Sequence, residues 1–284
     1  TSDLIPMSFC ATPLYIAEIS PTKIRGTLVS MFQLLITVGI LAAYISDSLL
    51  ADNSNPESWR PMFYVGVIPA IILYIGMYFL PETPRWLMSK GREAEALKVL
   101  RKTEDPKLVE KSIDNMRKEI QQDKSQMPWT EIFKPWMRNA LIIAVGIMFF
   151  QQFVGINTVI YYSPDIFLRA GFNGNQAAIW ASVSVGVVNV LFTILSLFLI
   201  DKIGRRKLFF IGTAGIFASL VLIGACFALS DALGEFTKIV LVASMLIYIA
   251  FFAISLGPLA WLIISEIFPL KVRGLGSSIG SLAN

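Results

Sequence analysis

The sequence predicts an all-α polytopic membrane protein, on three observations. Hydrophobic residues make up 55% of its 284 residues and charged residues 15%, against roughly 25% charged residues in a soluble domain. Six runs of at least 19 residues contain no Asp, Glu, Lys or Arg, and about 20 helical residues cross a bilayer. The basic residues between the runs alternate between rich and poor loops. This composition excludes a soluble, a disordered and a nucleic-acid-binding protein.

The six uncharged runs are continuously apolar, which favours helices over the alternating strands of a barrel. They cover residues 28–46, 62–80, 139–164, 177–200, 208–230 and 239–265. Shorter apolar runs, 4–17 and 275–284, lie at the two ends of the chain. Because no basic region precedes the first, it lacks the pattern of a signal peptide. We expect a stretch of a longer protein, with one helix cut at each end.

Loop charges predict the orientation. The loops at 18–27, 81–138, 201–207 and 266–274 hold 21 of the 24 Lys and Arg residues, and the intervening loops hold 3. Basic loops stay in the cytoplasm, so we expect a multi-pass protein of the cell (inner or plasma) membrane. The net charge of +4 therefore reports topology, and the lipid bilayer rather than nucleic acid is the expected partner.

The segment 81–138 is the one long polar part of the sequence. Asp105 and Pro106 match the start of a helix, and Val109, Ile113 and Met116 follow at helical spacing. We expect short amphipathic helices here, with a solvated linker as the alternative. The segment would divide the chain into residues 1–80, 81–138 and 139–284.

The chain lacks the groups that most catalytic and metal sites require. It contains no His, and Cys10 and Cys226 stand alone in apolar runs. Neither a nucleophile nor a pair of acids falls at membrane depth. We therefore expect no enzyme, no metal site and no cofactor.

An internal repeat suggests two related halves. Residues 17–26 read AEISPTKIRG and residues 265–274 read SEIFPLKVRG, with six of ten positions identical. Both copies lie in basic loops, which indicates parallel repeats of the kind found in one large transporter architecture.

Together with PETPRWL at 81–87, QQFVGINTVIYY at 151–162, DKIGRR at 201–206 and GPLAWLIISEIFP at 257–269, the repeat resembles the sugar porter branch of the major facilitator superfamily. The resemblance implies a twelve-helix, two-half fold, of which this chain runs from the end of helix four to the start of helix eleven. It also implies transport of a neutral monosaccharide.

Uncharged amides inside the runs fit such a substrate. Both an amide and a sugar hydroxyl donate and accept hydrogen bonds, and no Lys or Arg lies mid-span for an anion. No single face of a straight helix holds Gln151, Gln152 and Asn157, so a break near Gly155 is needed for them to converge. The alternative is that each amide only bridges neighbouring helices.

The resemblance implies a sugar site and its gates. The sugar contacts would come from Gln33, Gln151, Gln152, Asn157, Asn189, Phe252, Trp261 and Asn284. Gly257 and Pro258 interrupt the last run, either as a hinge or as a static kink, and Tyr161 and Tyr162 would form a matching lid. Cytoplasmic charges would bridge the halves in one state: Glu18 with Arg25, Glu82 with Arg85, Asp201 with Arg205 or Arg206, and Glu266 with Arg273. Their alternative role is topological charge alone.

Proton coupling needs an acidic group within a span, and the six runs contain none. In proton-coupled sugar porters that carboxylate belongs to helix one, which this chain does not reach. We favour proton symport by a monomer. A facilitated-diffusion uniporter and a non-transporting sugar receptor stay as alternatives.

Overall fold

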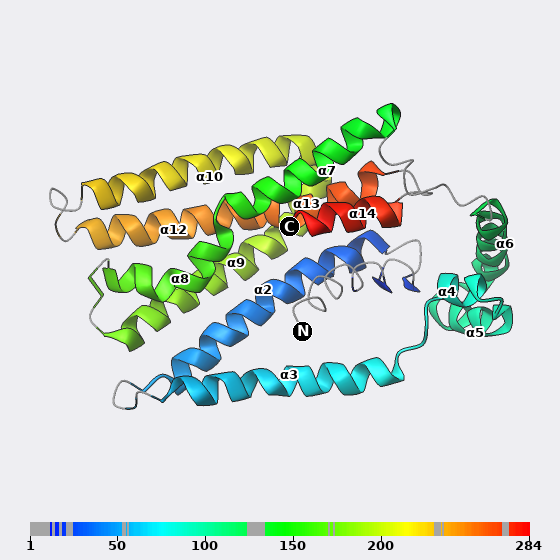
Figure 1. Ribbon diagram of the computed structural model, residues 1–284. Helices are drawn as coiled ribbons and strands as arrows, with labels where there is room; N and C mark the ends of the chain where they lie inside the picture. The colour runs from blue at the N-terminus through cyan, green and yellow to red at the C-terminus, as the bar shows by residue number, and fades with distance from the viewer. Residues whose placement is uncertain are drawn as a thin grey trace. The chain divides into compact units, whose positions relative to one another are not determined.

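The computed structural model describes residues 12, 15, 16, 19, 20, 25–52, 55, 57–123, 134–169, 171, 172, 174–229, 234, 236–268 and 273–284. Throughout these residues the regular structure is helical (Figure 1), which confirms the predicted all-α class. The helices are α2 (Arg25–Leu50), α3 (Trp59–Phe79), α4 (Pro84–Ser89), α5 (Glu93–Thr103), α6 (Pro106–Asp123), α7 (Pro135–Phe153), α8 (Ile156–Arg169), α9 (Asn175–Ile203), α10 (Arg205–Ala228), α12 (Phe236–Ile254), α13 (Leu256–Ile267) and α14 (Arg273–Leu282).

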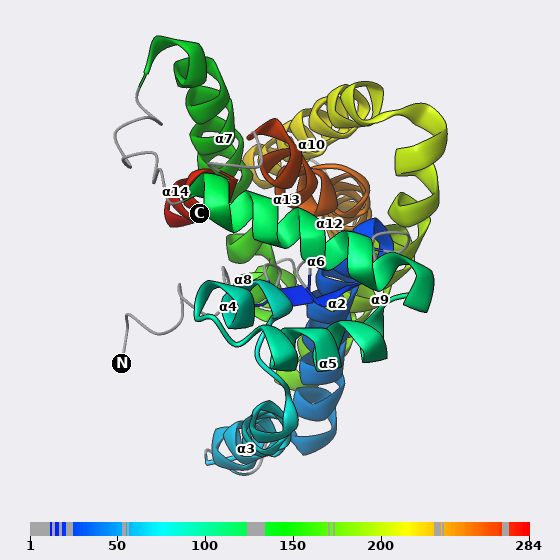
Figure 2. The same cartoon turned by 90° about the vertical axis from the view of Figure 1, so that its right-hand side faces the viewer.

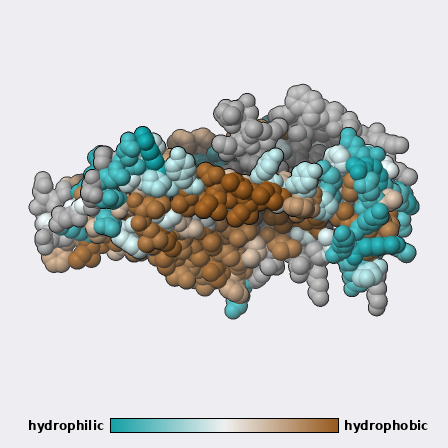
Figure 3. Space-filling view, turned by 90° about the horizontal axis from the view of Figure 1, so that it is seen from below, coloured by the Kyte–Doolittle hydropathy of each residue, from teal (hydrophilic) through white to brown (hydrophobic). Residues whose placement is uncertain are grey.

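Six helical segments of the described chain are long and apolar enough to cross a membrane. They coincide with the six predicted runs, and two of them are each built from two helices, α7 with α8 and α12 with α13. No side chain along α3 is buried, and most are exposed. Figure 3 shows a broad hydrophobic surface. Such a surface suits hydrocarbon rather than water.

Several helices run further than the uncharged runs that predicted them, and in two of them the extension brings an acidic residue into a spanning segment. α2 continues to Leu50 and so carries Asp47, and α8 continues to Arg169 and so carries Asp165. The expectation that the spans hold no acidic residue was therefore wrong. Both carboxylates lie near a helix end, where a charged group can still reach water.

The chain divides into two compact units, which we describe separately. Unit 1 comprises residues 1–32, 77–149 and 262–284, and unit 2 comprises residues 33–76 and 150–261. The predicted division into residues 1–80, 81–138 and 139–284 stays a prediction.

In unit 1, α4, α5 and α6 pack together (Figure 2). Thr83 accepts a hydrogen bond from the Trp86 amide and caps α4, and Pro106 begins α6 as predicted. The three helices share a small apolar core that includes Leu87, Leu100 and Ile113. The segment therefore holds amphipathic helices with a core of their own, and the alternative of a solvated linker is wrong.

In unit 2, α10 and α12 lie side by side, as do α8 and α9 (Figure 1). Their shared core includes Phe167, Val185, Ile216 and Tyr248. Gly212 lets α10 approach α12 closely, since a Cβ at this position would overlap the side chain of Ser255. This packing surrounds the two helix breaks on which the candidate site depends.

Candidate functional site

The first break separates α7 from α8, at the position that the amide spacing predicted. Gly155 has a φ of 82°, a conformation that glycine adopts without the steric cost of a Cβ. The Tyr248 hydroxyl donates a hydrogen bond of 2.8 Å to the carbonyl of Val154, directly before the glycine. Gly155 thus permits the break, and the hydrogen bond from Tyr248 connects the chain at the break to α12.

The two adjacent glutamines at this break point to different partners. Gln151 is 4% exposed, and its Nε2 donates to the carbonyl oxygens of Leu256, at 3.0 Å, and Gly257, at 3.4 Å. The Oε1 of Gln152 accepts a hydrogen bond of 2.7 Å from Nδ2 of Asn157. The break therefore brings Gln152 and Asn157 together, while Gln151 connects α7 to α13.

The second break separates α12 from α13 at Ser255. The sequence placed it at Gly257 and Pro258, but Pro258 lies inside the first turn of α13. The reason is that a proline disturbs the helix before it, where its missing N–H and its ring face the preceding turn. A Cβ on Gly257 would lie 3.5 Å from Nε2 of Gln33 and 3.5 Å from the ring of Phe252.

Gln33, Gln151 and Phe252 therefore surround one short stretch of backbone in unit 2, at Leu256 and Gly257. Trp261, half-buried, follows one turn later on α13. Amides, backbone carbonyl groups and an aromatic ring can match the hydroxyl groups and the C–H face of a sugar. No charged side chain is among them, which suits a neutral guest.

Two other predicted contacts have hydrogen-bond partners of their own. Asn189 is buried within α9, and its carbonyl accepts a hydrogen bond from Thr193. Asn284 belongs to unit 1, where its Nδ2 lies 3.4 Å from the sulfur of Met148. Their participation in a sugar site stays a prediction.

The predicted lid residues Tyr161 and Tyr162 are 73% and 56% exposed on α8; their role stays a prediction. Tyr44, which was not predicted from the sequence, donates a 2.6 Å hydrogen bond from its hydroxyl to the carbonyl of Ile160. Nearby, a Cβ on Gly186 would lie 3.0 Å from the Tyr44 ring. Ser182 and Gly186 are small residues four apart on α9, and such a pair indicates a position where another helix packs closely, here α2 with Tyr44.

The predicted cytoplasmic charge pairs fall largely outside the described residues. Glu18 lies outside them, as do the side chains of Arg25, Asp201, Glu266 and Arg273. Glu82, Arg85, Arg205 and Arg206 are exposed. Their pairing stays a prediction.

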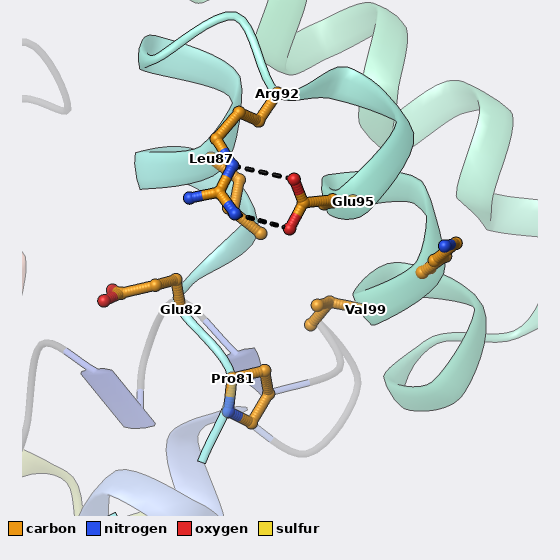
Figure 4. Close-up of a pocket in the computed structure, with 7 residues that line it drawn as sticks. Pro81, Glu82, Leu87, Arg92, Glu95 and Val99 are labelled. Carbon is orange, nitrogen blue, oxygen red and sulfur yellow. Dashed lines mark hydrogen bonds and ion pairs between the residues drawn. The ribbon is translucent and has the colours of Figure 1, made fainter. Parts of the chain in front are cut away.

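A separate pocket of about 410 Å³ lies beside α4 and α5 (Figure 4). Arg92 and Glu95 form a two-bond ion pair at its edge, with both N–O distances 2.7 Å, and this hydrogen bonding holds the pKa of Glu95 below its ordinary value. Glu82 turns away from that pair. Across the described residues, acidic and cysteine side chains form no cluster that could hold a metal ion.

Comparisons with known proteins show which family this chain resembles. The family model described as "Sugar (and other) transporter" matches residues 6–284. The chain is 42% identical over 275 residues to the glucose transporter GlcP of Staphylococcus epidermidis, covering 97% of this chain and 60% of the relative. It is 38% identical over 275 residues to the galactose-proton symporter of Escherichia coli K12, covering 96% and 58%.

The solved structure of the proton:xylose symporter XylE with bound 6-bromo-6-deoxy-D-glucose is 36% identical, with a TM-score of 0.79 over 95% of this chain and 56% of XylE. The chain thus spans somewhat more than half the length of the relatives that it matches. Its helices, its motifs and the match over nearly all of its residues show that the chain belongs to the sugar transporter family of the major facilitator superfamily.

Proposed function

We propose that the protein containing this chain carries a neutral monosaccharide, a hexose or a pentose, across the plasma membrane by alternating access, in symport with a proton. The observation that carries the proposal is the convergence of Gln33, Gln151 and Phe252 on the Leu256–Gly257 backbone. A buried, uncharged hydrogen-bonding surface beside an aromatic ring matches a polyol without the cost of burying a charge.

The relatives support the substrate class and the coupling. One similar protein is named a glucose transporter, one a D-xylose transporter and one a galactose-proton symporter, and the similar structure is a proton:xylose symporter. These names favour symport over the uniporter alternative. Bacterial relatives also favour the plasma membrane, and a transporter rather than an enzyme or a receptor. We propose that the complete protein acts as a monomer.

The two helix breaks supply candidate moving parts for alternating access. α8 carries Tyr161 and Tyr162 beyond the Gly155 break, and α13 carries Pro258 and Trp261 beyond the Ser255 break. Rotation of either segment about its break would change access to the amides. The cytoplasmic pairs, such as Glu82 with Arg85, would open and close on the other side, and exposed pairs of about 0–1 kcal/mol each permit repeated opening.

Counterflow in proteoliposomes tests the proposal. The protein expressed from its complete coding sequence is expected to exchange radiolabelled D-glucose, D-xylose or D-galactose, and Gln151→Ala is expected to lose most of that exchange. Gln176→Ala, an exposed glutamine at the start of α9, is the matched control and retains it. Alkalinisation of the outer medium on sugar addition reports proton symport. Exchange no faster than in protein-free liposomes for all three sugars would reject transport of these monosaccharides.

A further inference from the structure

Several prolines of unit 2 lie inside a spanning helix, beyond its first residue: Pro61 and Pro69 in α3, and two in helices that pack against others. These two are Pro164 in α8 and Pro258 in α13. Because proline has no N–H, it cannot donate to the carbonyl four residues earlier. For Pro164 and Pro258 these carbonyls belong to Ile160 and Ile254. Hydrocarbon offers no water as a substitute donor, so an unpaired carbonyl there costs several kcal/mol.

Each of these two carbonyls receives a hydroxyl from a different helix. The Tyr44 hydroxyl of α2 donates to Ile160 at 2.6 Å, and the Ser196 hydroxyl of α9 donates to Ile254 at 3.0 Å. Ser163 also donates to Ile160 from within α8, but at 3.3 Å. The same chemical solution therefore occurs twice, at sites almost one hundred residues apart in the chain.

The Ser196 hydroxyl donates to another helix rather than to its own. Serine and threonine inside helices commonly donate back to the carbonyl four residues earlier in their own helix, as Thr193 does on α9 and Ser219 does on α10. Ser196 is fully buried and instead donates across to α12. A contact of this kind fixes one helix relative to another.

The two capped carbonyls lie next to the candidate sugar site. Ile254 is two residues before Leu256, whose carbonyl accepts the Gln151 amide. Ile160 is three residues after Asn157, which donates to Gln152. A shift of either helix segment would therefore move an amide of the candidate site or the carbonyl that such an amide binds.

We infer that Tyr44 and Ser196 are positioning residues for the sugar site: each gives a hydroxyl to a carbonyl that a proline has left without its helical donor, and so sets the direction of α8 or of the α12–α13 break. The inference rests on the proposed function. Neither hydroxyl needs to touch the sugar.

Transport kinetics of the complete protein test the positioning role. Tyr44→Phe and Ser196→Ala are each expected to raise the KM for whichever of D-glucose, D-xylose and D-galactose is carried, by about three- to tenfold. The maximal rate should change less than the KM. Ser219→Ala removes an equally buried hydroxyl that serves its own helix, and should leave the KM unchanged.

Restoring the missing N–H provides the sharper test. In Pro258→Ala the new amide can donate to the carbonyl of Ile254, so Ser196→Ala should then have little further effect; Pro164→Ala should do the same for Tyr44→Phe. The crossed combinations, Ser196→Ala with Pro164→Ala and Tyr44→Phe with Pro258→Ala, should be additive because their members serve different carbonyls.

Thermal unfolding in detergent measures the Tm of the same four combinations of hydroxyl and proline variants, and it does not depend on transport activity. Each single hydroxyl deletion is expected to lower the Tm by about 2 °C, and each matched proline replacement should abolish that shift. Equal shifts with and without the matched proline would overturn the inference. Coupled Tm shifts with an unchanged KM would overturn the positioning role and leave only a contribution to stability.

If the wild-type protein carries none of the three sugars, the proposed function is contradicted, and the Tm cycles alone decide whether the hydroxyls serve the proline-freed carbonyls. Should Ser196→Ala fail to accumulate, Ser196→Cys, a much weaker donor of similar size, takes its place in the same cycle.

Discussion

Replacing Gly155 by alanine tests the first helix break in isolation. Its φ of 82° lies in the left-handed region, yet no heavy atom lies within 4 Å of where a Cβ would be. A substitution there meets no steric obstacle, and its cost comes from backbone conformation alone. For an L-residue this cost is about 1–2 kcal/mol. We therefore expect Gly155→Ala to lower the free energy of unfolding by that amount, which corresponds to roughly a five- to thirtyfold change in the folded-to-unfolded ratio.

A matched glycine gives the opposite expectation. Gly224 lies within α10, also has open space at its Cβ position, and is not among the glycines with positive φ. Gly224→Ala should raise the free energy of unfolding by up to about 1 kcal/mol, because alanine loses less conformational freedom in a helix. Gly155→Asn should cost less than Gly155→Ala, since asparagine tolerates the left-handed conformation better.

Equilibrium unfolding in mixed detergent micelles measures all three variants against the wild type. The reasoning fails if Gly155→Ala and Gly224→Ala change stability in the same direction and by the same amount. It also fails if Gly155→Ala is neutral, because the α7–α8 break would then not depend on a left-handed residue.

Three further predictions concern other parts of the chain. Thr83→Ala removes the side-chain acceptor at the start of α4 and should cost about 1 kcal/mol in unfolding measurements, whereas Thr83→Ser should cost little; equal losses would contradict the cap. Gly212→Ala, whose new Cβ would overlap Ser255, should cost about 1–3 kcal/mol, and Ser255→Gly in the same protein should recover part of it. Arg92 lowers the pKa of Glu95 from its ordinary 4.5, so the pair stabilises the fold fully above the unfolded-state pKa and ceases to do so as pH falls through the lowered value. The small Tm difference between Arg92→Ala and wild type should therefore be present at neutral pH and vanish once the pH lies below the lowered pKa of Glu95; a difference that persists in strong acid would refute this.

The spans and the first helix break could be predicted because each depends on residues close together in sequence. Crossing a bilayer requires a continuous stretch without charge, as at 177–200, and the left-handed turn before α8 requires a glycine at 155. The helix ends and the position of the second break were misjudged: α2 extends past Asp47, because a charge near a helix end costs little when it can reach water, and the last span breaks at Ser255 rather than at Gly257 and Pro258.

What the sequence determined by itself was therefore the family, the number of spans within the described chain and the residue types near the site. Tertiary structure alone decided that Gln151 reaches the carbonyl of Leu256, that the last span breaks at Ser255, and that Tyr44 and Ser196 supply the donors that two prolines lack. These partners are between 58 and 116 residues apart. A hydrogen bond between helices depends on their rotation and separation, which hydropathy and spacing within one helix do not specify.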